Sequence, residues 1–277
     1  MKTKILIVLL VVTGSLYSQN FQGKAIYKTH RKMDMKMDGP GMSDKMKDQM
    51  KAQMKKQFQK TFTLHFTKTT SVYKQEKKLS APVTTTNNGM RVMVMGGGGG
   101  SDVFYKNIKE NRYVNKTEIM GKRFLIKDKL PSFDWKLTGE TKNIGIYTCY
   151  KANYTREVDQ MMMKVDEKGK MKESKVKKEI VITAWYTPKI AVNNGPSNYT
   201  GLPGLILEIN EGNLTIVCSE IIMNSSEKGE IKEPKKGKVV TQEKFKKIMD
   251  KKTKEMMEQF RSRKGKKGNN IEIKIGG

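Results

Sequence analysis

Residues 205–223 read LILEINEGNLTIVCSEIIM, and this stretch decides the expected fold. Two apolar runs rich in β-branched residues, Leu205–Asn210 and Asn213–Met223, flank the dipeptide Glu211-Gly212. A glycine-containing pair between two such runs is typical of a tight β-hairpin. The run Leu205-Ile206-Leu207 has no polar alternation, which indicates a strand that is buried on both faces or lies at the centre of a sheet.

The residues before this hairpin form a second signal, Gly201-Leu202-Pro203-Gly204. Proline presets φ at the second position of a turn, and glycine accepts the positive φ that a type II turn needs at the third position. We therefore expect Gly201, Pro203 and Gly204 to build a tight turn that starts the strand. The loop that contains this turn has two interpretations: it is part of the architecture, or it lines a binding site.

Further strand candidates extend in both directions from this hairpin. They alternate polar and apolar residues or form short apolar runs bounded by turn residues. The candidates are residues 21–31, 61–73, 90–95, 103–106, 112–116, 122–127, 135–137, 145–154, 179–187 and, at the edge, 271–275. The charged stretch Lys164–Lys178 is expected to be an exposed hairpin tip.

Two segments have the spacing of amphipathic helices. Ser43-Asp44 is a start signal for a Met-rich helix over about 43–60, and Thr241 is an N-cap signal for a C-terminal helix over about 241–263. A basic tail follows at 264–277. In the first helix, Met42, Met46, Met50, Met54 and Phe58 recur every four residues; in the second, the apolar positions are Phe245, Ile248, Met249, Met256 and Phe260.

The expected fold class is mainly β (α+β). We predict a single domain with a curved antiparallel sheet of roughly eight to ten strands, an open or partial barrel, and two amphipathic helices that cover one face. The hydrophobic fraction of 36% is modest, and there is one long apolar run and only two cysteines. This composition excludes a polytopic membrane protein, a collagen and a disulfide-stapled miniprotein.

The first 18 residues have the pattern of a secretory signal peptide. Lys2 and Lys4 precede the apolar run Ile5–Val12, and the small residue Ser18 stands before the expected cut. The run is too short to span a bilayer. No cysteine follows the cut, so we expect an exported domain over 19–277 that is not a lipoprotein.

The chain is strongly basic, with 55 Lys+Arg against 28 Asp+Glu and a formal net charge of +27. The basic residues are mostly lysines spread along the whole chain, and the most concentrated group is Arg261–Lys267. A positive surface attracts polyanions. Since export argues against nucleic acid, we expect an anionic membrane or lipopolysaccharide surface to be the polyanion that the protein meets.

Four ordered blocks carry a family resemblance. They are Trp135–Lys142, Tyr147–Ala152, Ala184–Ile190 with Asn194-Gly195-Pro196, and the hexapeptide Gly201-Leu202-Pro203-Gly204-Leu205-Ile206. The chain resembles the GLPGLI family of exported Bacteroidetes proteins, which takes its name from that hexapeptide. The resemblance covers about residues 124–222 and implies a signal peptide and a β-rich domain in the periplasm or at the outer membrane. It implies no activity, cofactor or catalytic residue.

Cys149 and Cys218 both lie in strand-like runs. In an exported protein the two thiols can form a disulfide, which would stabilise the fold by about 4 kcal/mol in the chain-entropy model. They can equally remain buried thiols that pack as small hydrophobic groups. The sequence leaves both possibilities open.

Candidate chemistry is sparse. The two histidines, His30 and His65, lie in alternating strands, and no hydrolase, nucleotide-binding or zinc-protease motif is present. We therefore expect no enzyme and no cofactor, with an enzyme that uses unrecognised carboxylates as one alternative. The other alternative is copper: thioethers bind Cu(I), and Met33, Met35 and Met37 stand near His30. Methionines are equally suited to packing or to an adaptable apolar surface.

The leading hypothesis is a non-enzymatic binding protein. Curved sheets covered by helices commonly enclose ligand cavities, so we expect a concave face that binds an apolar ligand or an envelope protein partner. The candidate ligand residues are aromatic or apolar side chains in or beside the hexapeptide loop. They are Trp185, Tyr186, Tyr199, Leu202 and Pro203.

Overall fold

The computed structural model describes residues 21–32, 44, 48, 59–76, 103–165, 171–224 and 230–263. The expected signal peptide 1–18, nearly all of the Met-rich helix 43–60, the strand candidates 90–95 and 271–275, and the basic tail 264–277 lie outside these residues. No helix in the described part of the chain has the length and apolar composition of a membrane span.

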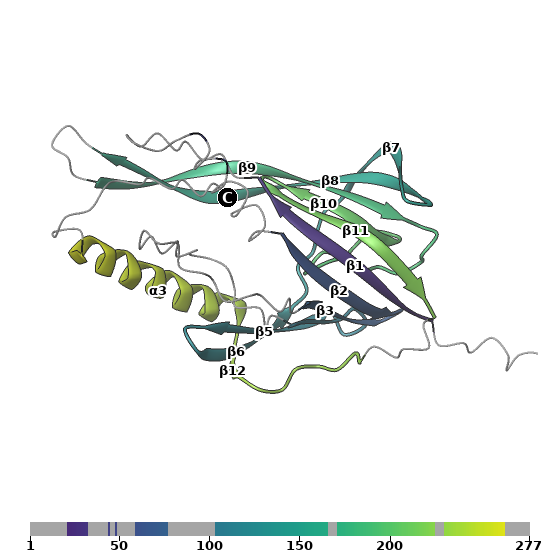
Figure 1. Ribbon diagram of the computed structural model, residues 1–277, viewed down its shortest axis with the longest axis horizontal. Coiled ribbons are helices and arrows are strands. Elements are labelled where there is room, and N and C mark those ends of the chain that lie inside the picture. The colour runs from purple at the N-terminus through teal and green to yellow at the C-terminus, as the bar shows by residue number, and fades with distance from the viewer. Residues whose placement is uncertain are drawn as a thin grey trace, which may run out of the picture.

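The described residues form one sheet of 12 strands and one helix, α3 (Figure 1). The sheet order is β12-β6-β5-β4-β3-β2-β1-β11-β10-β9-β8-β7, so it ends in two different edge strands and is open. The elements are β1 (Gln22–Arg31), β2 (Lys60–Thr67), β3 (Thr70–Gln75), β4 (Val103–Asn107), β5 (Arg112–Ile119), β6 (Lys122–Lys129), β7 (Lys136–Ile144), β8 (Tyr147–Val165), β9 (Met171–Thr187), β10 (Leu205–Glu211), β11 (Leu214–Met223), β12 (Lys238–Val240) and α3 (Gln242–Arg263).

The predicted hairpin is confirmed as β10 and β11, which pair antiparallel from Glu208↔Val217 to Glu211↔Leu214. β11 then pairs with β1, from Gly23↔Met223 to Arg31↔Leu214, so nearly the first and nearly the last strands meet at the middle of the sheet. All strand pairs are antiparallel except β12 with β6, which is parallel. The mainly β, antiparallel fold class is therefore confirmed, with more strands than expected.

The structure differs from the strand predictions in three places, of which one is a wrong boundary, one a hairpin longer than its expected tip and one an additional strand. Residues 61–73 are two strands, because Thr67 accepts backbone hydrogen bonds on its hydroxyl from Thr69 and Thr70 and turns the chain between β2 and β3. The charged stretch 164–178 is no simple tip, since β8 and β9 pair as far as Val165↔Met171. β12 was not expected, because its three residues carry no alternation.

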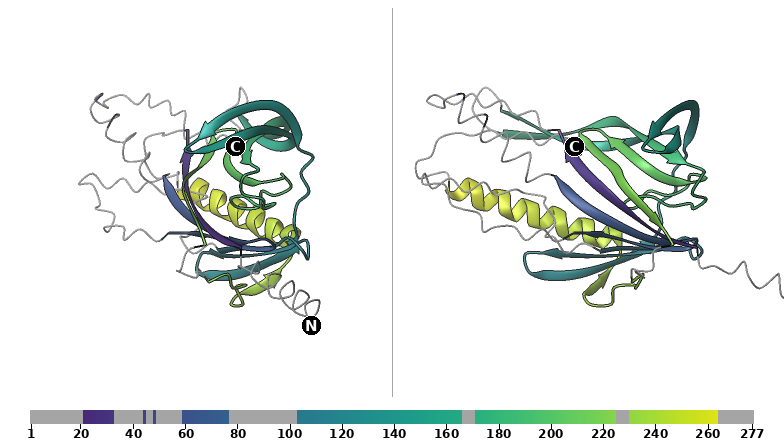
Figure 2. Two further views of the ribbon diagram at one scale, coloured as in Figure 1. Left: turned by 90° about the vertical axis from the view of Figure 1, so that its right-hand side faces the viewer. Right: turned by 45° about the vertical axis from the view of Figure 1, so that its right-hand side comes forward.

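The main core lies on the concave face of the sheet. Alternate residues of the central strands point to this face, and Tyr27, Leu64 and Phe66 are fully buried there. Figure 2 shows the sheet curving around α3. The loop between β9 and β10, residues 188–204, fills the rest of the concave side with Ile190, Val192, Tyr199 and Leu202. We call this loop the plug.

The C-terminal part of the chain holds the β5–β6 end of the sheet from both faces. Ile231 packs on the convex side against Val72, Tyr105, Val114 and Leu125. The chain then pairs as β12 along the edge of β6 and enters α3, whose Phe245 and Ile248 pack on the concave side with Phe124. The predicted cap is confirmed, because the Thr241 hydroxyl accepts the amide of Lys244 at 3.3 Å.

The hexapeptide turn differs from the expected type II turn. The positive φ falls on Gly201, at 97°, and not on Gly204. The amide of Gly204 donates to the carbonyl of Leu202 at 2.8 Å, which closes a γ-turn around Pro203. Gly204 is required for space: a Cβ there would lie 2.2 Å from the carbonyl oxygen of Thr187.

Gly204→Ala is therefore expected to destabilise the protein by about 2–3 kcal/mol, because the clash is with backbone that cannot rotate away. Urea unfolding followed by fluorescence measures the change. Pro203→Ala is the control at an exposed neighbour and should cost about 1 kcal/mol or less. Equal losses for the two variants would contradict the close contact at Gly204.

Candidate functional site

Lys106 of β4 is the central polar residue of the concave face. Its side chain is fully buried beneath the plug. The amine Nζ donates to the carbonyl oxygen of Gly195 at 2.6 Å and to that of Tyr199 at 3.4 Å. Lysine is almost never fully buried without a partner, and here the partners are two loop carbonyls. Burial lowers the pKa of Lys106 well below its ordinary value.

A second polar contact joins the plug to β3. The Asn194 side-chain oxygen accepts the Gly195 amide at 2.9 Å and the Ser71 hydroxyl at 3.3 Å. Ser71 pairs with Lys106 across β3 and β4, so both side chains reach the plug from the same face. The amide nitrogen Nδ2 of Asn194 and the hydroxyl of Tyr73 are buried without a hydrogen-bond partner among the described residues.

An aromatic cluster packs at the outer side of the plug. Phe133, Trp135, Tyr154 and Tyr199 lie with ring centroids 5.3–6.5 Å apart. The Trp135 indole donates to the carbonyl of Thr200 at 2.8 Å, and the Tyr199 hydroxyl donates to Glu211 at 2.7 Å. These bonds hold the plug against both β10 and the segment that leads into β7.

The structure places most of the predicted ligand residues in or against the main core and not around an open cavity. Tyr186, Tyr199 and Leu202 belong to the buried core, and Pro203 is exposed. Trp185 points to the opposite face of β9 from Tyr186, where the Lys142 amine lies 4.4 Å from its ring centroid. Lys142 also pairs with Glu208 at 2.7 Å. Adjacent residues of a strand face opposite sides, so Trp185 and Tyr186 cannot form one platform.

The predicted metal residues lie mostly outside the described part of the chain. Met33, Met35 and Met37 are among the residues that the structure does not describe. His30 is half-buried near the end of β1, opposite Thr215 of β11. Within the described ranges, no group of three or more His, Cys, Asp or Glu side chains is arranged to hold a metal ion.

The two cysteines are free thiols and are not joined in the structure. Both are buried, Cys149 in β8 and Cys218 in β11. Burial raises the pKa of Cys149 to about 11 and that of Cys218 to about 12. Both side chains are therefore protonated at neutral pH, and neither has the lowered pKa of a reactive nucleophile.

A two-stranded ribbon projects from the sheet beyond this core. β7 pairs with β8 only as far as Asn153, and β10 pairs with β9 only as far as Ile182. The next eleven residue pairs of β8 and β9, from Thr155↔Val181 to Val165↔Met171, pair with no third strand among the described residues. Figure 1 shows this ribbon extending above α3. We call residues 155–165 and 171–181 the arm.

Sequence analysis missed Lys106 and the arm. The only signal for the burial of Lys106 was its position two residues after Phe104, which puts both side chains on the same face of a short strand. A lysine in such a strand normally indicates the face that is exposed to solvent. The arm was missed because charged residues interrupt its apolar ones. By contrast, the loop with the hexapeptide was correctly singled out, and its architectural interpretation fits the buried plug.

Comparisons with known proteins give one family match. A family model described as "Protein of unknown function (Porph_ging)" matches residues 135–208, which run from the aromatic cluster through the plug to β10. No curated protein matches the chain. Among solved structures there is a weak similarity to "Structure of PNGF-II in C2 space group", with 14% identity, a TM-score of 0.46 and coverage of 83% of this chain.

The second PNGF-II structure, in the P21 space group, gives the same identity and TM-score. The chain spans about a third of the length of that protein, 32% and 33% in the two structures.

The burial of Lys106 predicts how the free energy of unfolding depends on pH. Its pKa is lowered in the folded state and lies near 10.4 in the unfolded chain. Between these two values the unfolded state binds more protons, so stability rises with pH across that window and is lowest below the folded pKa. Lys106→Met should remove this slope, which urea unfolding at a series of pH values measures.

Lys109→Met is the matched control, since Lys109 is exposed two residues beyond the end of β4. It should leave the pH dependence of the free energy of unfolding unchanged. An unaltered slope in Lys106→Met would show that the buried amine does not titrate between the folded and unfolded states.

Proposed function

We propose that the protein is a non-enzymatic binding protein of the bacterial envelope, that it belongs to the GLPGLI family, and that it binds a protein partner through the arm. The family proposal is supported by the literal hexapeptide at 201–206, which falls inside the matched region 135–208. The export pattern of the first 18 residues supports an envelope location. The arm is the observation that carries the binding proposal.

The concave face favours a protein partner over a small apolar ligand. Two of the side chains expected to line a ligand cavity, Tyr199 and Leu202, instead belong to the plug that fills it. Two glycines of the plug have no room for a Cβ: Gly204 lies against the backbone of Thr187, and Gly195 lies against the side chain of Ile206. A loop packed this tightly is part of the core.

The arm, in contrast to the plug, projects beyond the core. A two-stranded ribbon without a third strand or a packed helix is marginally stable in water. Neither edge of the arm pairs with another strand of the described part of the chain, and Val176 and Val181 are 44% and 53% exposed. Open strand edges pair readily with extended segments of other chains. A partner that adds a strand would therefore stabilise the arm while it binds.

Site-specific photocrosslinking in the native host tests this proposal. A photoreactive residue placed at Val176 or at Val181 should give the same discrete protein adduct, which mass spectrometry identifies. The control position is Val239, which is 60% exposed on β12, at the far edge of the sheet. It should not give that adduct.

A variant without the arm completes the test. Replacing 158–178 with a two-residue turn shortens β8 and β9 but leaves their pairing with β7 and β10 intact. The identified partner should bind the purified full chain and should not bind this variant. Adducts of lipid size at the arm, or equal protein adducts at all three positions, would contradict the proposal.

A second candidate function is Cu(I) binding, and strand register favours it. Arg31 pairs with Leu214, Leu214 with Glu211, and Glu211 with Ile182 at the base of the arm. The chain therefore leaves β1 towards Met33, Met35 and Met37 at the same end of the sheet from which the arm carries Met161, Met162 and Met163. Clustered thioethers suit a soft cation.

Titration with Cu(I) against a competing chelator tests this function. The triple variant M33L/M35L/M37L should lose affinity for the metal without a change in the free energy of unfolding. The control is M120L/M223L/M249L, which removes three methionines from the hairpin turn before β6, from β11 and from α3. Equal Cu(I) affinity of both variants and the original chain would exclude these thioethers as ligands.

A further inference from the structure

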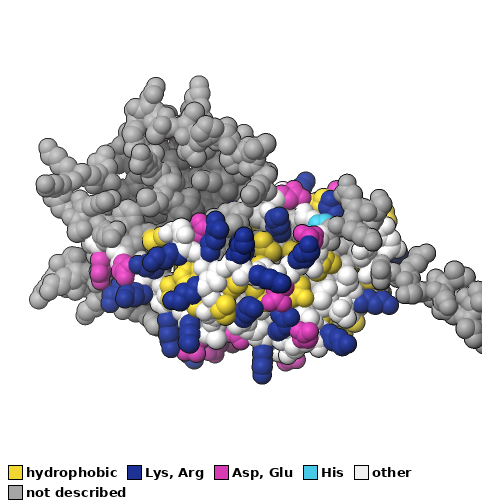
Figure 3. Space-filling view, turned by 90° about the horizontal axis from the view of Figure 1, so that it is seen from below, with side chains coloured by type: hydrophobic (Ala, Val, Ile, Leu, Met, Phe, Trp, Pro, Cys, Tyr) yellow, Lys and Arg dark blue, Asp and Glu magenta, His cyan; other side chains and the backbone are white. Residues whose placement is uncertain are grey.

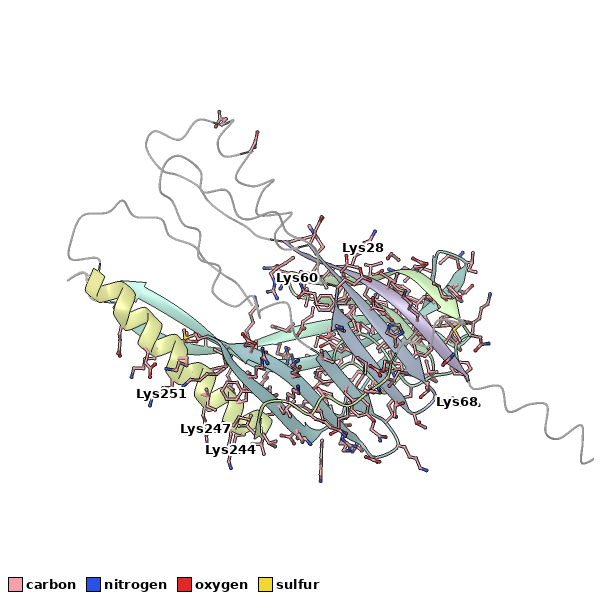
Figure 4. All side chains as sticks on the ribbon, turned by 60° about the horizontal axis from the view of Figure 1, so that its bottom comes forward. Lys28, Lys60, Lys68, Lys244, Lys247 and Lys251 are labelled. Atoms are coloured by element: carbon pink, nitrogen blue, oxygen red, sulfur yellow. The ribbon has the colours of Figure 1, made fainter. Side chains whose placement is uncertain are left out.

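α3 carries a row of lysines on the side away from the sheet. Lys244, Lys247 and Lys251 are exposed and lie three and four residues apart, which places them along one face of the helix. Figure 4 shows them pointing outward from α3. Phe245 and Ile248 hold the other side of the helix against the β6 end of the sheet. The row is therefore fixed in position by the packing of its own helix.

The charge on this row is only partly balanced. Lys247 forms an ion pair with Glu243 at 2.7 Å, and Lys251 is close enough to Glu255 to help lower the pKa of that carboxyl, whereas Lys244 forms no ion pair within the described residues. Helix α3 as a whole has eight basic and four acidic residues. The sequence after it, 264–277, adds four lysines against one glutamate. Positive charge thus continues along the chain from the exposed face of α3.

Three exposed or half-buried lysines elsewhere on the sheet serve as a comparison. Lys28, Lys60 and Lys68 belong to β1, β2 and the turn after β2, and Figure 4 shows them away from α3. Lys68 lies 5.9 Å from the ring centroid of Phe21. Figure 3, which views the molecule from below, shows many Lys and Arg side chains among acidic and hydrophobic ones.

We propose that the outward face of α3 docks on an anionic phospholipid surface. Lysine is a flexible point charge that attracts phosphate without a preformed pocket, which suits headgroups that move in a fluid layer. A short row of lysines on a rigid helix presents these charges together. Each lysine close to an anionic surface strengthens binding by about fivefold. This docking surface is independent of the arm and of any protein partner.

Co-sedimentation with vesicles tests the docking surface. The probes are vesicles of phosphatidylcholine mixed with phosphatidylglycerol, and vesicles of phosphatidylcholine alone. The protein should bind the mixed vesicles only, and added salt should weaken the binding. The variant K244Q/K247Q/K251Q should partition roughly 100-fold more weakly, as three fivefold contributions imply.

The matched control is K28Q/K60Q/K68Q, which removes the same charge from β1, β2 and the following turn. Charges more than about 10 Å from the surface are screened, so this variant should lose less than about threefold. Circular dichroism verifies that both variants fold. Equal losses would overturn the proposal in favour of general attraction by net charge. Binding to soluble polyphosphate but not to the mixed vesicles would also overturn it.

Discussion

The contact between the Lys106 amine and the carbonyls of Gly195 and Tyr199 holds the concave side of the sheet together. It crosses from β4 to the plug and joins strands that are far apart in the sheet order. Without it, two loop carbonyls would face the core with no donor, which is costly in an apolar interior. Tyr199 links this contact to its surroundings, because its ring packs with Phe133 and its hydroxyl donates to Glu211, which also pairs with Arg156.

Local signals in the sequence predicted the elements that local forces determine. The β10–β11 hairpin, the Thr241 cap and the span of α3 follow from turn chemistry and periodicity, and all three are confirmed. Features set by distant contacts were not predictable. The role of Gly204 depends on Thr187 across the sheet, and the burial of Lys106 depends on a loop some ninety residues later. The sequence could have predicted that Trp185 and Tyr186 face opposite sides of the sheet, because adjacent residues of a strand alternate between its two faces.

Packing separates the molecule into a closed part and an open part. The plug fills the concave side of the sheet, and Ile231, β12 and Phe245 hold its β5–β6 end from both faces. In the arm, β8 and β9 pair only with each other among the strands that the structure describes. The region matched by the family model, 135–208, includes the plug and the β8 and β9 strands from which the arm extends. The tightly packed plug and the projecting arm therefore belong to adjacent parts of the same matched region.

The pairing of β1 with β11 has a consequence for how the protein folds. Gly23 meets Met223, and the edge pairing of β12 with β6 again joins segments more than a hundred residues apart. The contact order of such a sheet is high, and folding is slow when non-local strands must find each other. β1 can pair with β2 early, but its other edge has no partner until β11 has been synthesised. During that interval the free edge of β1 is open to aggregation.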